Sequence, residues 1–227
     1  CRLDAVLIPT KQAVLDMKAS LDGAGITNQD QALRQAAGQA FYNTSKFTMR
    51  DLRSRASQAQ LKADFEAYLD GFSPNVQEIL VNFNFRNQVP KLVKADALGF
   101  LIGKYLDPTI NFSPKPVGNL PALDNHAMGT IFEELVRKFN EENNEEAGEH
   151  FTPRDVVRLM SRLILLPIAE QIQSTTYLVY DGACGTGGML AEAQNYLRDH
   201  HEAAKLYVFG QDYNKRAYAT AASDMLM

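Results

Sequence analysis

The sequence predicts two parts: an α-helical N-terminal domain over residues 1–123, then the start of an α/β domain over residues 124–227. Three observations predict this division. The first hundred or so residues carry runs of helix-forming residues. A turn-rich segment with four prolines, residues 107–121, follows them and is the best candidate for a domain boundary. Beyond it, two short β-prone runs flank a glycine-rich turn and a helical run, which is typical of a strand–helix–strand unit.

The α/β part is organised around the stretch from Tyr177 to Leu190, Tyr-Leu-Val-Tyr-Asp-Gly-Ala-Cys-Gly-Thr-Gly-Gly-Met-Leu. β-prone residues lead into Asp181, a loop of small residues follows, and residues 189–197 predict a helix. Glycines let a backbone turn sharply and approach a ligand without Cβ clashes. The free N–H groups at the start of a helix attract a carboxylate or a phosphate. We therefore favour a ligand-binding turn over an ordinary connection between a strand and a helix.

The acidic residues around this turn favour one class of ligand. Dinucleotide dehydrogenases place the last glycine of G-x-G-x-x-G where this chain has Leu190. Asp181 repels a pyrophosphate but suits a ligand with an ammonium and a sulfonium, as in S-adenosylmethionine (SAM). A second predicted strand, residues 206–210, runs into Asp212, where such folds bind ribose hydroxyls. The pattern therefore predicts a SAM site.

Composition argues against several other classes of protein. No run of about 18 apolar residues exists, so we expect no membrane span. Two cysteines, Cys1 and Cys184, fit a reducing cytoplasm better than a disulfide framework. The four histidines and two cysteines lack the spacing of zinc ligands, so we expect no metal site. A net charge of −4 is not that of an autonomous nucleic-acid binder, so a nucleic-acid substrate would require a partner that supplies much of the phosphate binding.

In the N-terminal part we expect four helices with clear signals. They cover residues 31–40, residues 58–70 with Gly71 as the stop, residues 75–81 after the capping pair Ser73-Pro74, and residues 91–106 as one apolar helix. Residues 82–88, a polar and aromatic run, predict a capped turn with buried phenylalanines; a contact loop is the alternative.

Five basic residues form a cluster in this part: Lys46, Arg50, Arg53, Arg55 and Lys62. The cluster can contact DNA phosphates, although a solvated helix face is at least as good an interpretation. We expect the N-terminal domain to contact partners and DNA rather than a cofactor, because it carries none of the ligand motifs.

After the turn-rich segment, an apolar stripe over residues 128–139 predicts a helix, and the acidic run 141–148 predicts a solvated loop. In the segment that follows, residues 148–155, Thr152 suits an N-cap, Pro153 suits a first helical position, and Asp155 suits the acid of a capping box. Phe151 before the cap fits a hydrophobic staple.

Three motifs in this order resemble the modification (methyltransferase) subunits of type I restriction–modification systems, which are SAM-dependent adenine-N6 DNA methyltransferases. The motifs are Glu149-His-Phe-Thr-Pro-Arg154, Asp181-Gly-Ala-Cys-Gly-Thr-Gly-Gly188 and Gly210-Gln-Asp-Tyr-Asn214. Residues 125–135 are similar to the family's entry into its catalytic domain, and residues 2–11 and 83–88 to its helical N-terminal domain. The resemblance implies a helical N-terminal domain followed by the start of an α/β SAM-dependent methyltransferase (Rossmann-like) domain.

The resemblance also implies which residues bind SAM. They are Glu149, His150, Phe151, Thr152, Pro153, Arg154, Asp181, Gly185, Thr186, Gly187, Gly188 and Asp212. Asp181 would lie near the ammonium, Asp212 would accept hydrogen bonds from the ribose hydroxyls, and the Phe-Thr-Pro element would enclose the cofactor. A covalent role for Cys184, as in cytosine-C5 methylation, is the alternative that we disfavour, because no general base is adjacent to it.

One departure from the family is large. Its catalytic motif, Asn-Pro-Pro followed by an aromatic residue, would lie downstream of the second strand, and no Pro-Pro pair occurs in this sequence. We therefore expect a fragment that lacks residues before Cys1 and after Met227 and contains no catalytic residue.

For the full-length protein, the resemblance implies methyl transfer from SAM to N6 of a flipped adenine in DNA, in the cytoplasm. The implied partners are DNA, a specificity subunit, a restriction subunit and a second methyltransferase subunit. Two alternatives stay open: a SAM-dependent methyltransferase of RNA or protein, and a non-catalytic assembly module that keeps a SAM-binding fold.

Overall fold

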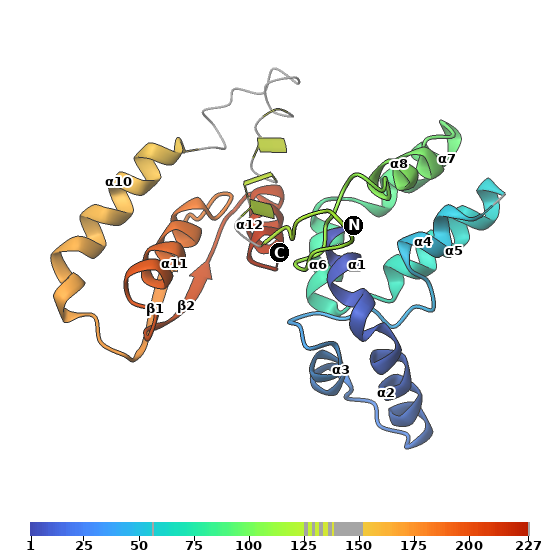
Figure 1. Ribbon diagram of the computed structural model, residues 1–227, viewed down its shortest axis with the longest axis horizontal. Coiled ribbons are helices and arrows are strands. Elements are labelled where there is room, and N and C mark those ends of the chain that lie inside the picture. The colour runs from blue at the N-terminus through green and yellow to red at the C-terminus, as the bar shows by residue number, and fades with distance from the viewer. Residues whose placement is uncertain are drawn as a thin grey trace. The chain divides into compact units, whose positions relative to one another are not determined.

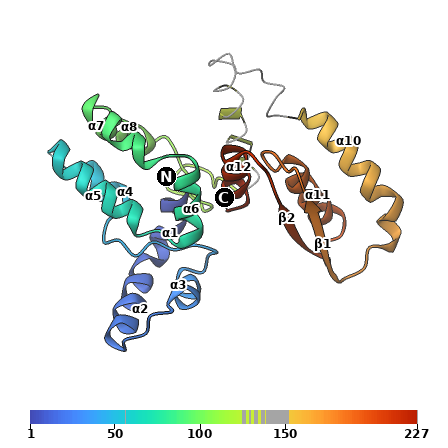
Figure 2. The ribbon, with the colours of Figure 1, turned by 180° about the vertical axis from the view of Figure 1, so that it is seen from behind.

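The computed structural model describes residues 1–55, 57–124, 127–128, 130–131, 134–135, 138 and 152–226. The chain divides into two compact units, Cys1–Gly129 with Leu226–Met227, and Thr130–Met225. The described residues are mostly helical, with one two-stranded parallel sheet (Figures 1 and 2). None of the helices described is both long and apolar enough to cross a membrane. The domain boundary between residues 123 and 124 stays a prediction.

The described elements of the first unit are all helices or 3₁₀ turns. They are α1 (Arg2–Leu7), η1 (Ile8–Thr10), α2 (Lys11–Gly23), α3 (Asp30–Ala37), α4 (Met49–Arg53), α5 (Gln58–Asp70), α6 (Pro74–Asn82), η2 (Arg86–Gln88), α7 (Val89–Lys94) and α8 (Leu98–Tyr105). They share one apolar core, because each helix turns a few aliphatic or aromatic side chains inward. Its most deeply buried members are Val14, Leu33, Phe41, Leu52, Val76, Val89 and Ile102.

Local signals located several of these helices correctly. α5 spans the predicted residues 58–70 with Gly71 as its C-cap, and α6 begins after Ser73 with proline in its first turn. α3 is shorter than predicted, because Gly38 takes a left-handed conformation with φ of 63° and ends the helix. The sheet of the second unit follows the prediction equally closely.

The prediction of one helix over residues 91–106 is wrong. The chain forms α7 and α8 instead, and Asp96 lies between them with a φ of 52°. Asp96 accepts a hydrogen bond from the side-chain amide of Gln58, the first residue of α5. A contact between distant parts of the sequence thus stabilises a break that apolar spacing alone does not reveal.

Of residues 82–88, the first ends α6, residues 83–85 form a packed turn, and residues 86–88 form η2. Asn84 adopts a φ of 54°, and Phe85 packs against Phe65 with ring centroids 6.4 Å apart. Arg86 donates a hydrogen bond to Gln77 and forms an ion pair with Asp70 at 2.6 Å. This agrees with the interpretation as a turn, although Phe83 and Phe85 are half-buried rather than buried.

The proline-rich segment packs on the first unit. The guanidinium of buried Arg2 donates hydrogen bonds to the carbonyls of Phe112 and Leu123, both at 2.8 Å. The two compact units divide only after this segment, at residues 129 and 130. The turn-rich segment, residues 107–121, is therefore part of the helical unit and is not a flexible linker between the two units.

The second unit contains a parallel strand–helix–strand arrangement. Its described elements are α10 (Arg154–Leu165), η3 (Leu166–Gln171), β1 (Thr176–Asp181), α11 (Gly188–His200), β2 (Lys205–Gly210) and α12 (Lys215–Leu226). β1 pairs with β2 so that Tyr177 lies opposite Leu206 and Asp181 opposite Gly210. The two predicted strands and the predicted helix between them are confirmed.

The cap of α10 differs from its prediction. The helix begins at Arg154, and its N-cap is Pro153 without a side-chain hydrogen bond, so Thr152 is not the cap. The ψ of Pro153 is 137°, an extended value, and the chain therefore becomes helical one residue later than expected.

Only one face of the sheet is covered within the described second unit. Val179 and Val208 pack on the cluster of Cys184, Leu190 and Ala221, which joins the sheet to α11 and α12. The opposite face carries two cross-strand pairs with more than half of each side chain exposed. They are Leu178 with Tyr207 and Tyr180 with Phe209. Parallel sheets are usually covered on both faces.

Gly71 provides a test of the packing in the first unit. A Cβ at this position would lie 2.7 Å from Oδ1 of Asn43 and 2.8 Å from Cβ of Ser45, and would also overlap the backbone nitrogen of Ser45. Gly71→Ala should therefore lower the free energy of unfolding by about 1–3 kcal/mol, as overpacked interiors do. Urea denaturation measures the change.

The matched control is Gly103→Ala within α8, where nothing lies within 4 Å of an added Cβ. That substitution should stabilise the chain by about 0.5–1 kcal/mol, because alanine favours the helix. Equal effects of the two substitutions would contradict the packing described around Gly71.

Candidate functional site

The loop between β1 and α11 has a backbone that requires glycine at two positions. Gly185 and Gly187 have φ values of 52° and 85°, in the left-handed region that other residues rarely adopt. A Cβ on Gly187 would also lie 3.0 Å from Cβ of Ala221 in α12. Because Gly187 is the N-cap residue of α11, the helix starts directly from the loop. The first N–H groups of that helix have no partner within the helix and can face a ligand.

Asp212 ties this loop to the end of β2. One oxygen of its carboxylate accepts the N–H of Gly185 at 2.8 Å, and the other accepts the N–H of Asn214 at 2.6 Å. Gln211 adds two backbone bonds, because its carbonyl accepts from Cys184 and its N–H donates to Asp181, both at 2.9 Å. The turns after the two strands therefore form one hydrogen-bonded edge of the sheet.

The two predicted acids lie on either side of the loop. Asp181 ends β1, is half-buried, and accepts the N–H of Ala183 at 3.1 Å. Asp181 and Asp212 both act on the thiol of Cys184, whose pKa is raised by burial first and then by these two carboxylates. Both acids are thus within electrostatic range of the same loop atom, as a shared site requires.

The environment of Cys184 makes it a poor nucleophile. Its side chain is 7% exposed and packs against Leu190 and Ala221. The thiolate is the reactive form of cysteine, and a raised pKa lowers its population at neutral pH. The structure therefore weighs against the covalent role that the sequence left as an alternative.

α10 begins beside α11. Val157 lies 3.8 Å from the position of a Cβ on Gly188, and Arg158 approaches Glu192 with 4.0 Å between Nε and Oε1. Further along, Leu165 packs against α11. The first turns of two helices are therefore neighbours, and both of their positive dipole ends favour a negatively charged group nearby.

The described structure covers part of the predicted site. Thr152 and Pro153 are exposed immediately before α10, and Arg154 is its first residue, of whose side chain nothing is described. Glu149, His150 and Phe151 lie outside the described residues. Asp181, Asp212 and the glycine loop come together at the sheet edge, with Thr186 half-buried within it. The binding role of each residue stays a prediction.

The structure adds residues that sequence reasoning did not place in the site. Tyr180 donates a hydrogen bond to the side chain of Gln211 at 3.1 Å. Tyr213, next to Asp212, is fully exposed. Asn214 caps α12 by accepting the N–H groups of Arg216 and Ala217. The sequence could have indicated this role of Asn214, because asparagine is a preferred N-cap residue and stands here just before a helical run.

Gly210 is a further structural requirement of this edge. A Cβ there would lie 2.9 Å from Sγ of Cys184 and 3.0 Å from Cδ1 of Leu190. The glycine that ends β2 therefore makes room for the loop that follows β1. Among the described residues, no group of three or more His, Cys, Asp or Glu side chains is placed to hold a metal ion.

A glycine loop between a parallel strand and a helix, with an acid after the next strand, defines a class of α/β proteins that can hold an organic ligand at the sheet edge. Residues 123–227 match the model of the N-6 DNA Methylase family. The whole site described above lies within this matched part of the chain.

Among characterised proteins, the chain is similar to methylase subunits of type I restriction enzymes. It is 27% identical over 139 residues to the HindI methylase subunit of Haemophilus influenzae, and the aligned region covers 59% of this chain and 28% of that protein. It is 30% identical over 111 residues to the EcoEI methylase subunit of Escherichia coli, covering 46% of this chain and 21% of that one. Identity to the MjaVII methylase subunit of Methanocaldococcus jannaschii is 33% over 93 residues, covering 41% and 15%. The matched region thus spans less than a third of each relative.

The environment of Cys184 leads to a test by thiol labelling. In a Cys1→Ser background, iodoacetamide should modify native Cys184 more slowly than the same cysteine in denaturant. Burial and the two carboxylates hold the pKa of the native thiol above its usual value, so the protonated form predominates to higher pH. The native rate should rise only as the pH passes the ordinary cysteine range. Rapid modification at pH 7 would restore the covalent alternative.

Proposed function

We propose that this protein is the methyltransferase subunit of a type I restriction–modification enzyme, and that it transfers the methyl group of SAM to N6 of adenine in DNA. The observation that carries the proposal is the hydrogen bond from the N–H of Gly185 to Asp212. It brings the glycine loop and the second acid to one sheet edge, inside the region that matches the N-6 DNA Methylase family. The names of the relatives support the type I assignment.

The residues present fit SAM chemically. The loop backbone and the start of α11 would hold the carboxylate of the methionine part, and Asp181 would lie near its ammonium. Asp212 would accept hydrogen bonds from the ribose hydroxyls. An ionised carboxylate can accept about four hydrogen bonds, so the two from Gly185 and Asn214 leave acceptor capacity for a ligand. In this proposal, β1, α11 and β2 begin a Rossmann-like SAM-binding domain.

Methylation of adenine at N6 requires the target base to leave the duplex. The target base must be flipped from the stack so that its amino group reaches the sulfonium of SAM. Binding in line then brings the two reacting atoms together, and SAM supplies the activated methyl group. We infer that a specificity subunit reads the DNA sequence, which agrees with the modest net charge of −4. A restriction subunit and a second methyltransferase subunit complete the proposed complex, which acts in the cytoplasm.

Calorimetric titration of SAM into the full-length protein tests the cofactor site. Asp212→Ala should weaken binding by about 1–3 kcal/mol, because ribose hydroxyls would lose a charged acceptor. The control is Asp199→Ala, an exposed acid near the end of α11 that pairs only with its neighbour Arg198 among the described residues. Since Asp212 also holds Gly185, the thermal midpoint without ligand must be compared in both variants. Unchanged affinity in a folded Asp212→Ala protein would remove this residue from the site.

A second experiment tests the reaction. The full-length protein, purified with its specificity subunit, should transfer tritium from labelled SAM to duplex DNA, and digestion should recover the label in N6-methyladenine. Transfer to RNA or to a protein instead would contradict the proposed substrate. Absence of SAM binding would favour a non-catalytic assembly role.

A further inference from the structure

Positive charge is concentrated in the helical part of this chain. Residues 1–124 contain fourteen Lys and Arg against twelve Asp and Glu, whereas residues 125–227 contain nine against fifteen. Five of the fourteen lie between Lys46 and Lys62, a segment whose only acid is Asp51. An uneven distribution of this kind identifies the surface on which a polyanion would be attracted, even though the whole chain is acidic.

Some cations of this cluster form ion pairs with an acid, and others do not within the described residues. Arg55 pairs with Asp64 at 2.6 Å, and Lys62 pairs with Glu66 at 3.8 Å. Arg53 is close enough to Asp107 to help lower the pKa of that carboxyl, an effect due mainly to hydrogen bonds from Thr109. Within the described residues, Lys46 and Arg50 are exposed and form no ion pair.

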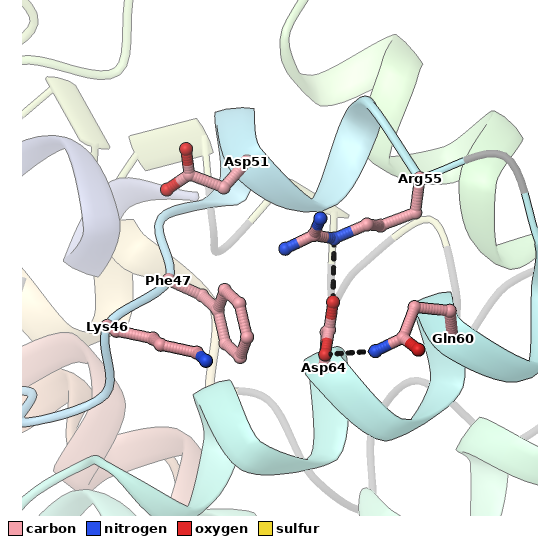
Figure 3. Close-up of a pocket in the computed structure, with 6 residues that line it drawn as sticks. All are labelled: Lys46, Phe47, Asp51, Arg55, Gln60 and Asp64. Atoms are coloured by element: carbon pink, nitrogen blue, oxygen red, sulfur yellow. Dashed lines mark hydrogen bonds and ion pairs between the residues drawn. The ribbon is translucent and has the colours of Figure 1, made fainter.

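Lys46 and Arg55 line a hollow in the first unit, of about 450 Å³, shown in Figure 3. Its six lining residues come from the segment before α4, from α4 itself, from the turn after it, and from α5. They are Lys46, Phe47, Asp51, Arg55, Gln60 and Asp64. The hollow thus combines two cations, one aromatic ring, one amide and two acids.

Arg55 is held in place by a buried acid. Asp64 is 7% exposed, pairs with Nε of Arg55, and accepts a hydrogen bond from Gln60 at 2.7 Å. Nε of Arg55 makes the ion pair with Asp64, and Figure 3 shows the two terminal nitrogens of the guanidinium pointing away from Asp64. A side chain oriented in advance in this way loses little freedom when it binds a ligand.

Phe47 is a second support for the two cations. The ammonium of Lys46 lies 5.1 Å and the guanidinium of Arg55 5.4 Å from the centroid of this ring, which is 8% exposed. Both distances are within the range of cation–π attraction. The ring therefore keeps two positive groups close together although no acid neutralises Lys46 within the described residues.

The acids of the hollow already have donors from the protein itself. Asp51 accepts the backbone N–H and the hydroxyl of Thr48, both at 2.8 Å, in a capping box at the start of α4, and these bonds lower its pKa. Asp64 has Arg55 and Gln60. Lys46 and Arg55 keep N–H groups to spare, so the hollow has an excess of donors, which suits an anion with several acceptor oxygens.

We propose that this hollow binds a phosphate of the DNA backbone, with Lys46 and Arg55 as its donors. Asp64 acts as the positioning residue for Arg55. Phosphate contacts of this kind orient a protein on a duplex without reading its sequence. The choice of DNA as the polyanion rests on the proposed function, whereas the binding of an anion rests on the geometry of the hollow alone.

The test is the salt dependence of DNA binding by the full-length protein in complex with its specificity subunit. Fluorescence anisotropy with a labelled 30-base-pair duplex measures affinity from roughly 50 to 200 mM salt. Lys46→Ala should weaken binding and flatten the slope of log affinity against log salt by about 0.9, the value for one phosphate contact. The ratio of the DNA affinity of the unsubstituted protein to that of Lys46→Ala should accordingly fall about 3-fold over that salt range.

Lys62→Ala is the matched control, because it removes the same charge from neighbouring α5 but outside the hollow and from a paired lysine. Its slope should equal that of the unsubstituted protein. Arg55→Lys, which keeps a cation beside Asp64 but lacks the forked nitrogens, should also weaken binding without loss of thermal stability. Equal slopes for Lys46→Ala and Lys62→Ala would overturn the proposal.

Two further readouts separate this proposal from its alternatives. If Lys46→Ala no longer copurifies with the specificity subunit, the hollow is a protein interface and the phosphate site is wrong. Titration of SAM into Lys46→Ala should give unchanged affinity. If the unsubstituted protein binds no SAM while Lys46→Ala still flattens the slope, the proposed methyltransferase function fails and the phosphate site stands.

Discussion

The carboxylate of Asp212 is the constraint on which the candidate site depends. It accepts backbone N–H groups from the turn after β1 and from the turn after β2, through Gly185 and Asn214. These turns belong to a loop whose glycines have left-handed φ values, and an unrestrained glycine loop has a large conformational entropy to lose. One acid thus restrains the segment that a ligand would otherwise have to order.

The same carboxylate has two roles that are linked in free energy. It stabilises the loop in the absence of a ligand, and in our proposal it binds the ribose as well. A substitution of Asp212 would therefore change loop order and cofactor affinity together, which explains why stability and binding have to be measured side by side. Cys184 also links the two turns, because its N–H bonds to the carbonyl of Gln211 and its sulfur lies in the space that Gly210 leaves free.

In the helical unit, an acid likewise positions a group whose binding role is proposed. Asp64 holds Arg55 over Phe47, so one cation of the cluster, for which the sequence left a phosphate contact and a solvated helix face open, forms an ion pair within the unit. Lys46, which lacks such a partner within the described residues, carries the uncompensated charge. Among the described residues of the second unit, nothing covers the sheet face that carries the exposed pairs Leu178 with Tyr207 and Tyr180 with Phe209, in contrast to most parallel sheets.

The sequence by itself determined the elements whose causes are local. β-prone residues and glycines predicted β1 and the loop before α11, and Ser73 with Pro74 predicted the start of α6. Only the tertiary structure decided the break at Asp96, the pairing of Arg55 with Asp64 and the bond between Gly185 and Asp212. These depend on atoms that are distant in sequence and meet only when the chain packs, so no local propensity or spacing encodes them.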